Sequence, residues 1–344
     1  MARGAFEAPR TEGRRVDGYE VFPIPPQGLR GVDHVQPDGP ALFCSRFGPE
    51  VYEQLGRTGS LPSALASAGI ALELRTLGCQ RLRARGRLVR RIDDAEEAVF
   101  DLEREGQPVA RAHVPGDALE FDLVFELRSS PYVRLHLPAT HSAGFVALET
   151  DGPLQPQEPR RRVLWALGDS VTQGLHLAGP SEAFPRVAAD AMGLDLHNAG
   201  IAGIEAVAVP DLRAPPDLGA AVLQLGINDW AGDIEPEAAV AAVRSRWASL
   251  GVPAVVVPPL PWPALEGSPR GPKLTAFRRA FLEEAGQQGL PLLDIAGLSE
   301  DPADYDHCHP GRAVHRALGL LVAAELQRIR RPPQPAVTTI PATP

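Results

Sequence analysis

The sequence of 344 residues has little cysteine: Cys44, Cys79 and Cys308, an odd number, and no pair with the Cys-x-x-Cys spacing. Such usage argues against a disulfide framework and is typical of reduced thiols in a cytosolic protein. The first ten residues contain no apolar stretch of the kind found in secretory signals. We therefore expect a cytoplasmic protein, while an export route that the sequence does not encode stays open.

Positive charge is also scarce, because 34 lysines and arginines face 43 acidic residues and the formal net charge is −9. Binding to phosphates of a nucleic acid needs a basic face, so nucleic acid is not an expected partner. No apolar run approaches the length of a membrane span, so a membrane is not expected either. With 44% hydrophobic and 22% charged residues, the composition is that of an ordinary globular protein.

Two common motifs are missing. The sequence has no Gly-x-Ser-x-Gly, since position 172 is threonine in the one comparable stretch, so the usual nucleophile elbow of α/β-hydrolases is absent. The glycine-containing stretch 168–174 is not followed by Gly-Lys-Ser/Thr, so a phosphate-binding loop is not expected.

The first half of the chain has the pattern of an all-β domain. Residues 1 to about 70 are rich in proline, and we expect irregular chain there. Beyond them, short segments with alternating apolar and polar residues are separated by turn residues, without helices between them. These segments are Ala71–Leu77, Ala98–Glu103, Ala118–Glu126, Tyr132–Leu137 and Gly144–Glu149. The pattern predicts an antiparallel β-sandwich of the jelly-roll kind.

The second half has a different pattern, beginning after the proline-rich stretch Asp151–Pro159. Short apolar strands alternate there with helices, which predicts a parallel sheet with helices on both faces. The strands are expected at Val163–Leu167, Leu194–Asn198, Ala220–Leu225, Ala254–Val257 and Leu290–Asp294. Helices are expected after a cap at Ser181 and at about 236–250, 273–288 and 310–329. We thus divide the chain into a β-sandwich domain at 1–155, an α/β domain at 156–331 and a mobile tail at 332–344.

Ser170 lies at the point where chemistry is expected in such a sheet. The run Val163–Leu167 leads straight into Gly168-Asp-Ser170, and open α/β sheets bind ligands beyond the carboxyl ends of their strands. A serine hydroxyl becomes nucleophilic when a base takes its proton, and the base is usually a histidine oriented by a carboxylate. Asp306-His-Cys-His-Pro310 presents both groups three residues apart.

Acyl transfer further needs hydrogen-bond donors for the negatively charged oxygen of the tetrahedral intermediate. Three candidates lie at strand ends. The stretch Asn198–Gly203 offers a backbone N–H group, Gly226-Ile-Asn-Asp229 offers the amide of Asn228, and Ser170 offers its own N–H group.

Taken together, Gly168–Gly174, Asn198–Gly203, Gly226–Asp229 and Asp306-x-x-His309-Pro310 resemble the four sequence blocks of the SGNH (GDSL-type) hydrolases, in order, over residues 162 to 330. The resemblance implies that Ser170 is the nucleophile, His309 its base and Asp306 the partner of the base. It implies an oxyanion hole of Ser170, Gly203 and Asn228, a three-layer α/β/α sandwich with flavodoxin-like strand order, and no metal or other cofactor. The stretch Ser67–Arg75 resembles more loosely the β-sandwich that precedes this domain in some bacterial members, which include esterases of decorated sugars and acyltransferases of natural products.

Each of these residues has a plainer interpretation. Ser170 can cap a helix, Gly203 and Asn228 can be turn residues, and Asp229 is expected to hold its loop through its carboxylate. Residues 306–309 have side chains that suit zinc, although nothing else in the sequence completes such a site. Trp230 and Trp262 suit a substrate pocket and ordinary packing equally well. His176 and His197 are expected to be hydrogen-bonded polar residues and not catalysts.

The function predicted from the sequence is hydrolysis of carboxylic esters with small acyl groups, borne on small molecules or carbohydrates, through an acyl-enzyme. An acyltransferase is the alternative, because an alcohol can replace water at the same intermediate. A non-catalytic carbohydrate-binding protein is the alternative from another class, and the full set of four motifs argues against it. The oligomeric state, the acyl length and the alcohol stay open.

Overall fold

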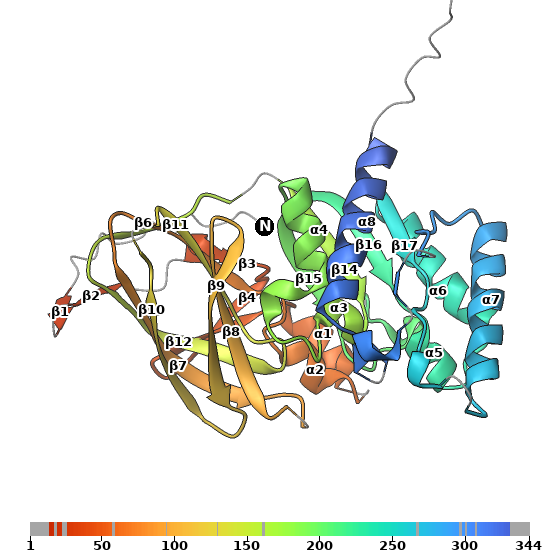
Figure 1. The fold of residues 1–344 in the computed structure, drawn as a ribbon, viewed down its shortest axis with the longest axis horizontal. Coiled ribbons are helices and arrows are strands. Elements are labelled where there is room, and N and C mark those ends of the chain that lie inside the picture. Colours follow the sequence, from red (N-terminus) through yellow and green to blue (C-terminus); the bar gives the residue numbers. More distant parts are fainter. Residues whose placement is uncertain are drawn as a thin grey trace, which may run out of the picture.

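A computed structural model describes residues 14–16, 19–22, 26–56, 59–93, 95–128, 130–159, 162–265, 268–295, 298–299, 301–306 and 308–330. Antiparallel strands come from the chain up to Pro156, and a parallel sheet starts at Val163. We call these the N-terminal part and the α/β part. In Figure 1 they lie side by side, at the left and the right. The predicted divisions of the chain into domains stay predictions, and the expected tail lies outside the described residues.

The N-terminal part consists of two antiparallel sheets. The seven-stranded sheet contains β1 (Arg14–Val16), β2 (Tyr19–Phe22), β4 (His34–Asp38), β5 (Ala41–Ser45), β7 (Arg81–Arg90), β10 (Glu120–Glu126) and β12 (His141–Thr150). The six-stranded sheet contains β3 (Leu29–Arg30), β6 (Ala71–Thr76), β8 (Glu97–Arg104), β9 (Gln107–Pro115), β11 (Tyr132–His136) and β13 (Leu154–Pro156). One core joins both sheets, for example through Leu72 and Phe100 from one and Phe145 from the other. The expected sandwich of antiparallel sheets is therefore present, whereas its jelly-roll connectivity stays a prediction.

The expectation of irregular chain before residue 70 is wrong for the described residues. This region contains η1 (Pro26–Gly28), β3, β4, β5, α1 (Pro49–Leu55) and α2 (Leu61–Leu65). Its prolines occupy positions that tolerate them: Pro49 is the first residue of α1, and Pro37 lies in β4, which pairs only with β5 along the sheet edge. Proline content alone was a poor guide because it marks helix starts and edge strands as well as loops.

The α/β part is built on a parallel sheet with the strand order β15-β14-β16-β17. Its strands are β14 (Val163–Gly168), β15 (Asp195–Gly200), β16 (Leu218–Gln224) and β17 (Ala254–Val257). This order matches the first four positions of a flavodoxin-like sheet. The expected fifth strand at 290–294 is reduced to a single parallel bridge between Val256 and Leu292. A separate two-stranded sheet pairs β18 (Tyr305–Asp306) with β19 (His309–Pro310).

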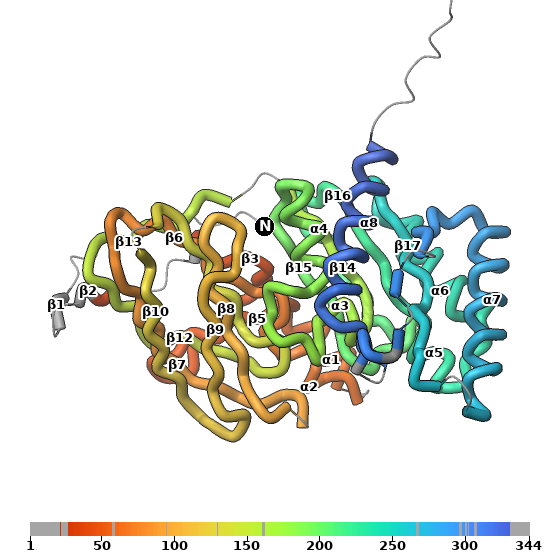
Figure 2. Tube along the Cα trace, in the orientation of Figure 1, coloured from red at the N-terminus to blue at the C-terminus, as the bar shows by residue number. Residues whose placement is uncertain are grey.

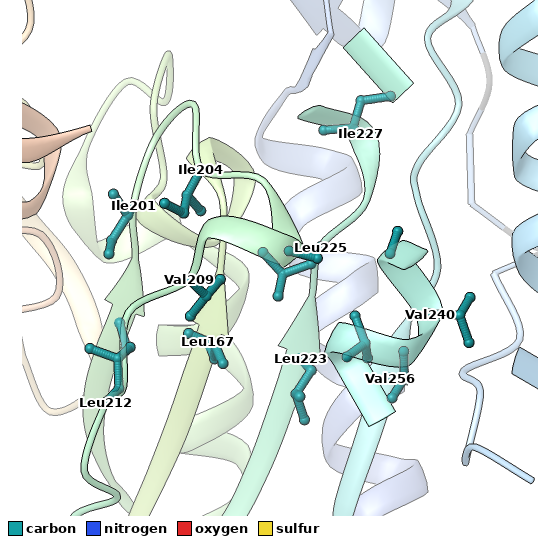
Figure 3. Packing of buried hydrophobic residues seen from close by; sticks show 14 of the residues in the cluster. Leu167, Ile201, Ile204, Val209, Leu212, Leu223, Leu225, Ile227, Val240 and Val256 are labelled. Atoms are coloured by element: carbon teal, nitrogen blue, oxygen red, sulfur yellow. The ribbon is translucent and has the colours of Figure 1, made fainter. Parts of the chain in front are cut away.

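Helices cover both faces of this sheet (Figure 2). On one face, α4 (Phe184–Met192) and α8 (Arg312–Arg330) pack on residues such as Leu164 and Val222. On the other, α6 (Pro236–Ala248) and α7 (Gly271–Gln287) pack on Leu167 and Leu223, in the core cluster that Figure 3 shows. Short elements are α3 (Ser170–Gln173), η2 (Pro180–Glu182), η3 (Ala206–Ala208), α5 (Ile227–Ala231), η4 (Pro263–Leu265) and η5 (Pro302–Asp304). Among the described residues, no helix combines the length and apolarity needed to cross a membrane.

Two expected helix starts differ from the structure. Ser181 does not cap α4; it lies in η2, and its hydroxyl donates to the carboxylate of Asp101 in β8 at 2.6 Å. Pro310 belongs to β19, and the last helix begins at Arg312. In both cases an interaction with another segment, a side-chain hydrogen bond for Ser181 and strand pairing for Pro310, places the residue outside the helix that the local sequence predicts.

Candidate active site

Ser170 lies directly beyond the carboxyl end of β14, as the first residue of α3. The Asp169 carboxylate caps this short helix by accepting from the Val171 N–H group at 2.9 Å. Glycine is required at position 168, because a Cβ atom there would lie 2.0 Å from Thr172 Oγ1 and 2.6 Å from the Gln224 carbonyl oxygen. The turn thus presents the Ser170 side chain at the end of the sheet, with 8% of the residue exposed.

The structure brings His309 to Ser170. His309 Nε2 lies 2.9 Å from Ser170 Oγ, although the residues are 139 positions apart. His309 is half-buried in β19, and its cross-strand partner in β18 is Asp306. The pairing places the backbone of Asp306 beside that of His309, whereas the Asp306 side chain lies outside the described part of the structure. Its role as the partner of the base stays a prediction.

The two other oxyanion candidates lie on neighbouring loops that follow β15 and β16. Gly203 has a φ of +76°, a left-handed conformation that favours glycine. Asn228 Nδ2 donates to the carbonyl oxygen of Ile204 at 3.0 Å, so its amide lies against the loop that carries Gly203. An amide nitrogen has two hydrogens, so one remains for a substrate oxygen.

Buried hydrophobic residues flank both donors and hold their loops. Ile201 and Ile204 enclose Gly203, and Ile227 precedes Asn228, and all three belong to the core cluster (Figure 3). Their side chains are at most 9% exposed. The loops are therefore anchored in the folded core, which suits donors that must be in place before the charge develops.

Two further buried carboxylates stabilise the backbone near the site, Asp229 at these loops and Asp169 at the turn of Ser170. Asp229 accepts from the Ala206 N–H group at 2.9 and 3.1 Å, which confirms the predicted structural role of this residue. Burial raises the pKa of Asp229. Burial likewise raises the pKa of Asp169 to about 7, against hydrogen bonds from Val171 and Gln224 that favour its ionised form.

The sequence predicts no role for His176 at the site, yet the His176 ring stacks on the His309 ring. The ring centroids lie 4.4 Å apart and the planes differ by 26°. His176 follows α3 in a left-handed conformation with a φ of +61°. An unusual φ in a non-glycine residue is a structural feature that composition and spacing do not reveal. His197, by contrast, is buried and lies 2.9 Å from the Arg46 carbonyl oxygen through Nε2, as a hydrogen-bonded polar residue should.

A cavity of about 400 Å³ lies beside His176, between the two parts of the protein. The α/β part contributes the segment from Gly174 to Leu177 with Gly179 and Pro180, and the N-terminal part contributes residues around Ile92, Glu97 and Thr140. Binding sites are common at such interfaces. Because His176 also stacks on His309, this cavity adjoins the Ser170–His309 pair.

Trp230 and Trp262 form an edge-to-face pair with ring centroids 5.9 Å apart. Trp230 is 7% exposed and belongs to the core cluster, with the Arg270 guanidinium above its ring. Trp262 lines a second cavity, of about 550 Å³, between the loop before η4 and helix α7. Both tryptophans thus pack in or against the core cluster, and a substrate-binding role for either of them stays a prediction.

The zinc interpretation of residues 306–309 gains no support from the described residues. His309 Nε2, one of its two possible metal-binding atoms, is engaged with Ser170 Oγ. Cys308 Sγ lies 3.7 Å from the other ring nitrogen. Within the described ranges, no group of three or more suitable side chains could hold a metal, and His307 falls outside those ranges.

An α/β sandwich with a serine and a histidine at the strand ends defines a class of esterase-type hydrolases. Residues 166–317 match the GDSL-like lipase/acylhydrolase family, as the four motifs predict. No curated protein matches the chain in sequence.

Solved structures share the two-part fold. A salicylyl-acyltransferase, SsfX3, from a tetracycline biosynthetic pathway is similar with a TM-score of 0.69 and 19% identity, over 92% of this chain and 98% of that one. A family two carbohydrate esterase from Cellvibrio japonicus gives 0.56 and 14% over 90% and 98%. The acetyl xylan esterase Est2A from Butyrivibrio proteoclasticus gives 0.56 and 13% over the same shares. At these identities the likeness concerns the fold alone.

Proposed function

We propose that the protein is a serine esterase that hydrolyses carboxylic esters through an acyl-enzyme on Ser170. The observation that carries the proposal is the 2.9 Å contact between Ser170 Oγ and His309 Nε2 at the carboxyl end of β14. This is the geometry expected of a nucleophile and its general base. Asp306, as the cross-strand partner of His309, is our candidate for orienting the base.

In the proposed mechanism, His309 Nε2 accepts the proton of the Ser170 hydroxyl while Oγ attacks the ester carbonyl carbon. The carbonyl oxygen becomes an oxyanion, which receives hydrogen bonds from the N–H groups of Ser170 and Gly203 and from the Asn228 amide. The intermediate then expels the alcohol, which takes the proton from His309. Water attacks the acyl-enzyme with His309 again as base, and the acid leaves.

Acyl transfer to an alcohol is the second candidate, supported by the cavity beside His176 and by the resemblance of the fold to an acyltransferase. A transferase must bind a second alcohol near the acyl-enzyme and keep water from it. An interface cavity suits that task, but it suits a sugar ester awaiting hydrolysis equally well. The esterases among the similar folds, such as those from Cellvibrio japonicus and Butyrivibrio proteoclasticus, support hydrolysis.

The test is a panel of p-nitrophenyl esters of rising acyl length, with Ser170→Ala as the matched variant. We expect Ser170→Ala to lose roughly 10⁴- to 10⁶-fold in kcat, as nucleophiles of this kind do, with an unchanged melting temperature. Unchanged turnover by the purified variant would overturn the proposal. Product analysis with hydroxylated acceptors then separates the candidates: free acid supports hydrolysis, and new ester as the main product at millimolar acceptor supports transfer.

A further inference from the structure

Arg46 is a fully buried cation at the interface of the two parts. It directly follows β5, and its residue is 0% exposed. Burying a charge is costly unless its donors are satisfied. Burial lowers the pKa of Arg46 to about 10, so the guanidinium remains charged near neutral pH.

Among the described residues, Arg46 donates to five backbone carbonyl oxygens. Three belong to the N-terminal part: Nη2 donates to Ser63 and Ala64 at 2.8 and 3.3 Å, and Nε donates to Ala66 at 2.8 Å. The other two belong to β15: Nη1 donates to Asn198 at 3.2 Å and to Gly200 at 2.6 Å. One side chain thus joins the end of α2 to the end of β15.

The end of β15 matters because the loop of Gly203 begins there. The peptide group between Gly200 and Ile201 is held on both sides, since its carbonyl oxygen accepts from Arg46 and its N–H group donates to the Gly168 carbonyl oxygen at 2.9 Å. Gly168 is the residue that ends β14, two positions before Ser170. Arg46 therefore fixes the peptide plane from which the loop leaves the sheet, next to the turn of the proposed nucleophile.

A second path links the N-terminal part to the same loop. Gln173 Oε1 accepts from the Ala202 N–H group at 2.8 Å, while its Nε2 donates to the carbonyl oxygen of Ala139 at 2.8 Å. Ala202 directly precedes Gly203, and Ala139 belongs to the N-terminal part. Gln173 thus ties the loop to both parts.

The main chain of the N-terminal part also packs closely against β15. Gly69 has a φ of +73°, and a Cβ atom there would lie 2.3 Å from the Cβ atom of Asn198 in β15. The His197 ring lies 2.9 Å from the carbonyl oxygen of Arg46 itself through Nε2. The contact at β15 therefore sets main chain of the N-terminal part directly against side chains of β15, which leaves it little freedom to shift.

We infer that Arg46 is a positioning residue for the oxyanion hole, through which the N-terminal part holds the Gly203 loop in its active conformation. The inference rests on the proposed function. It adds a role for the N-terminal part, which helps to determine kcat whether or not this part contacts the substrate. Lysine cannot replace arginine here, because an ammonium has three donors on one atom and cannot reach carbonyl oxygens on two sides.

The test compares Arg46→Lys with Arg134→Lys. Arg134 is a matched control, since it is 2% exposed and joins β11 to Asp190 of α4 across the same interface, without contact to the Gly203 loop. We expect Arg46→Lys to lower kcat about 10- to 100-fold, the scale of a misplacement of about 1 Å, with KM changed less than about threefold. Arg134→Lys should keep kcat within about threefold of the original protein.

A second measurement is the affinity for a boronic acid that forms a tetrahedral adduct with the serine. General destabilisation of the fold would not change this affinity. The affinity should fall in Arg46→Lys by the same factor as kcat/KM and stay unchanged in Arg134→Lys. Normal kcat in Arg46→Lys, equal losses in both variants, or a lower kcat with unchanged boronate affinity would each overturn the inference.

Gln173→Glu covers the case in which Arg46→Lys does not fold. A glutamate oxygen can still accept from Ala202, but its other oxygen faces the Ala139 carbonyl oxygen without a hydrogen, so only the link to the N-terminal part is lost. We expect kcat to fall several-fold at pH 8, and an unchanged kcat would contradict the inference. The proposed function fails separately, if Ser170→Ala keeps its turnover.

Discussion

The imidazole of His176 lies against the imidazole of His309, with 4.4 Å between ring centroids. His309 is the proposed base, so the neighbouring ring limits how far that base can rotate away from Ser170. His176 also lines the cavity between the two parts, so it connects the cavity lining with the base.

We predict that His176→Ala lowers kcat by about two- to tenfold, the range that corresponds to the loss of an aromatic pair. His176→Phe is the matched variant, because it keeps a flat ring at the same backbone position, where φ is +61° and alanine is strained as well. It should retain most of the activity. Steady-state kinetics of both variants on one ester provide the measurement, and equal kcat values for alanine and phenylalanine would argue against a role for the stacked ring.

Asn228→Ala should lower kcat by roughly 10²- to 10³-fold, the usual contribution of one oxyanion donor. KM should change little, because the amide interacts most strongly once the substrate oxygen carries charge. The measurement is the separate determination of kcat and KM, together with a melting curve, since Asn228 also donates to Ile204. A raised KM with a normal kcat would instead place Asn228 in substrate binding.

The α/β part was the more predictable half, for a physical reason. A buried parallel strand must be almost wholly apolar, and its end must carry a turn, so Val163–Gly168 and Ala254–Val257 are visible as apolar runs. Ser170 follows the first of these runs, and the Gly203 and Asn228 loops follow the neighbouring strands β15 and β16, which is why the positions of all three at strand ends could be predicted. The segment at 290–294 failed as a strand because Pro291 lacks an N–H group, leaving one bridge at Leu292.

Contacts between segments far apart in sequence could not be predicted in the same way. Arg46 binds carbonyl oxygens more than 150 positions away, and any residue type offers a carbonyl oxygen, so no pattern of side chains marks the partners. The strand β7 (Arg81–Arg90) was missed although arginine alternates with buried residues along it, because two of the buried positions are Ala84 and Gly86, which give only a weak apolar signal. These features depend on the assembled fold.

Chelation of metal should leave the esterase activity intact. The proposed mechanism uses Ser170, His309 and hydrogen-bond donors alone, so every step has a protein group to carry it. Exhaustive dialysis against EDTA, followed by an ester assay, is the measurement. Loss of activity that zinc restores would favour residues 306–309 as a ligand set and would count against His309 as the base.

The stability of the fold should depend on pH through Asp169. Its pKa is raised by burial to about 7, above the value of about 3.9 for an exposed aspartate. Between these values the folded protein binds a proton that the unfolded chain releases. The stabilisation from that proton is therefore full below about pH 4 and is lost as the pH rises through about 7, with a limiting slope of about 1.4 kcal/mol per pH unit.

Asp169→Asn removes this proton and so isolates the effect. The asparagine oxygen can still accept from Val171, and the Gln224 amide must turn to accept from the new NH₂ group, which lowers stability by an amount that does not vary with pH. The difference in unfolding free energy between the original protein and Asp169→Asn should shrink from pH 5 to about pH 7 and level off by pH 8, because only the original folded protein loses a bound proton over that range. Urea unfolding followed by circular dichroism at four pH values measures it. A constant difference across the series would show that Asp169 is ionised throughout, in spite of its burial.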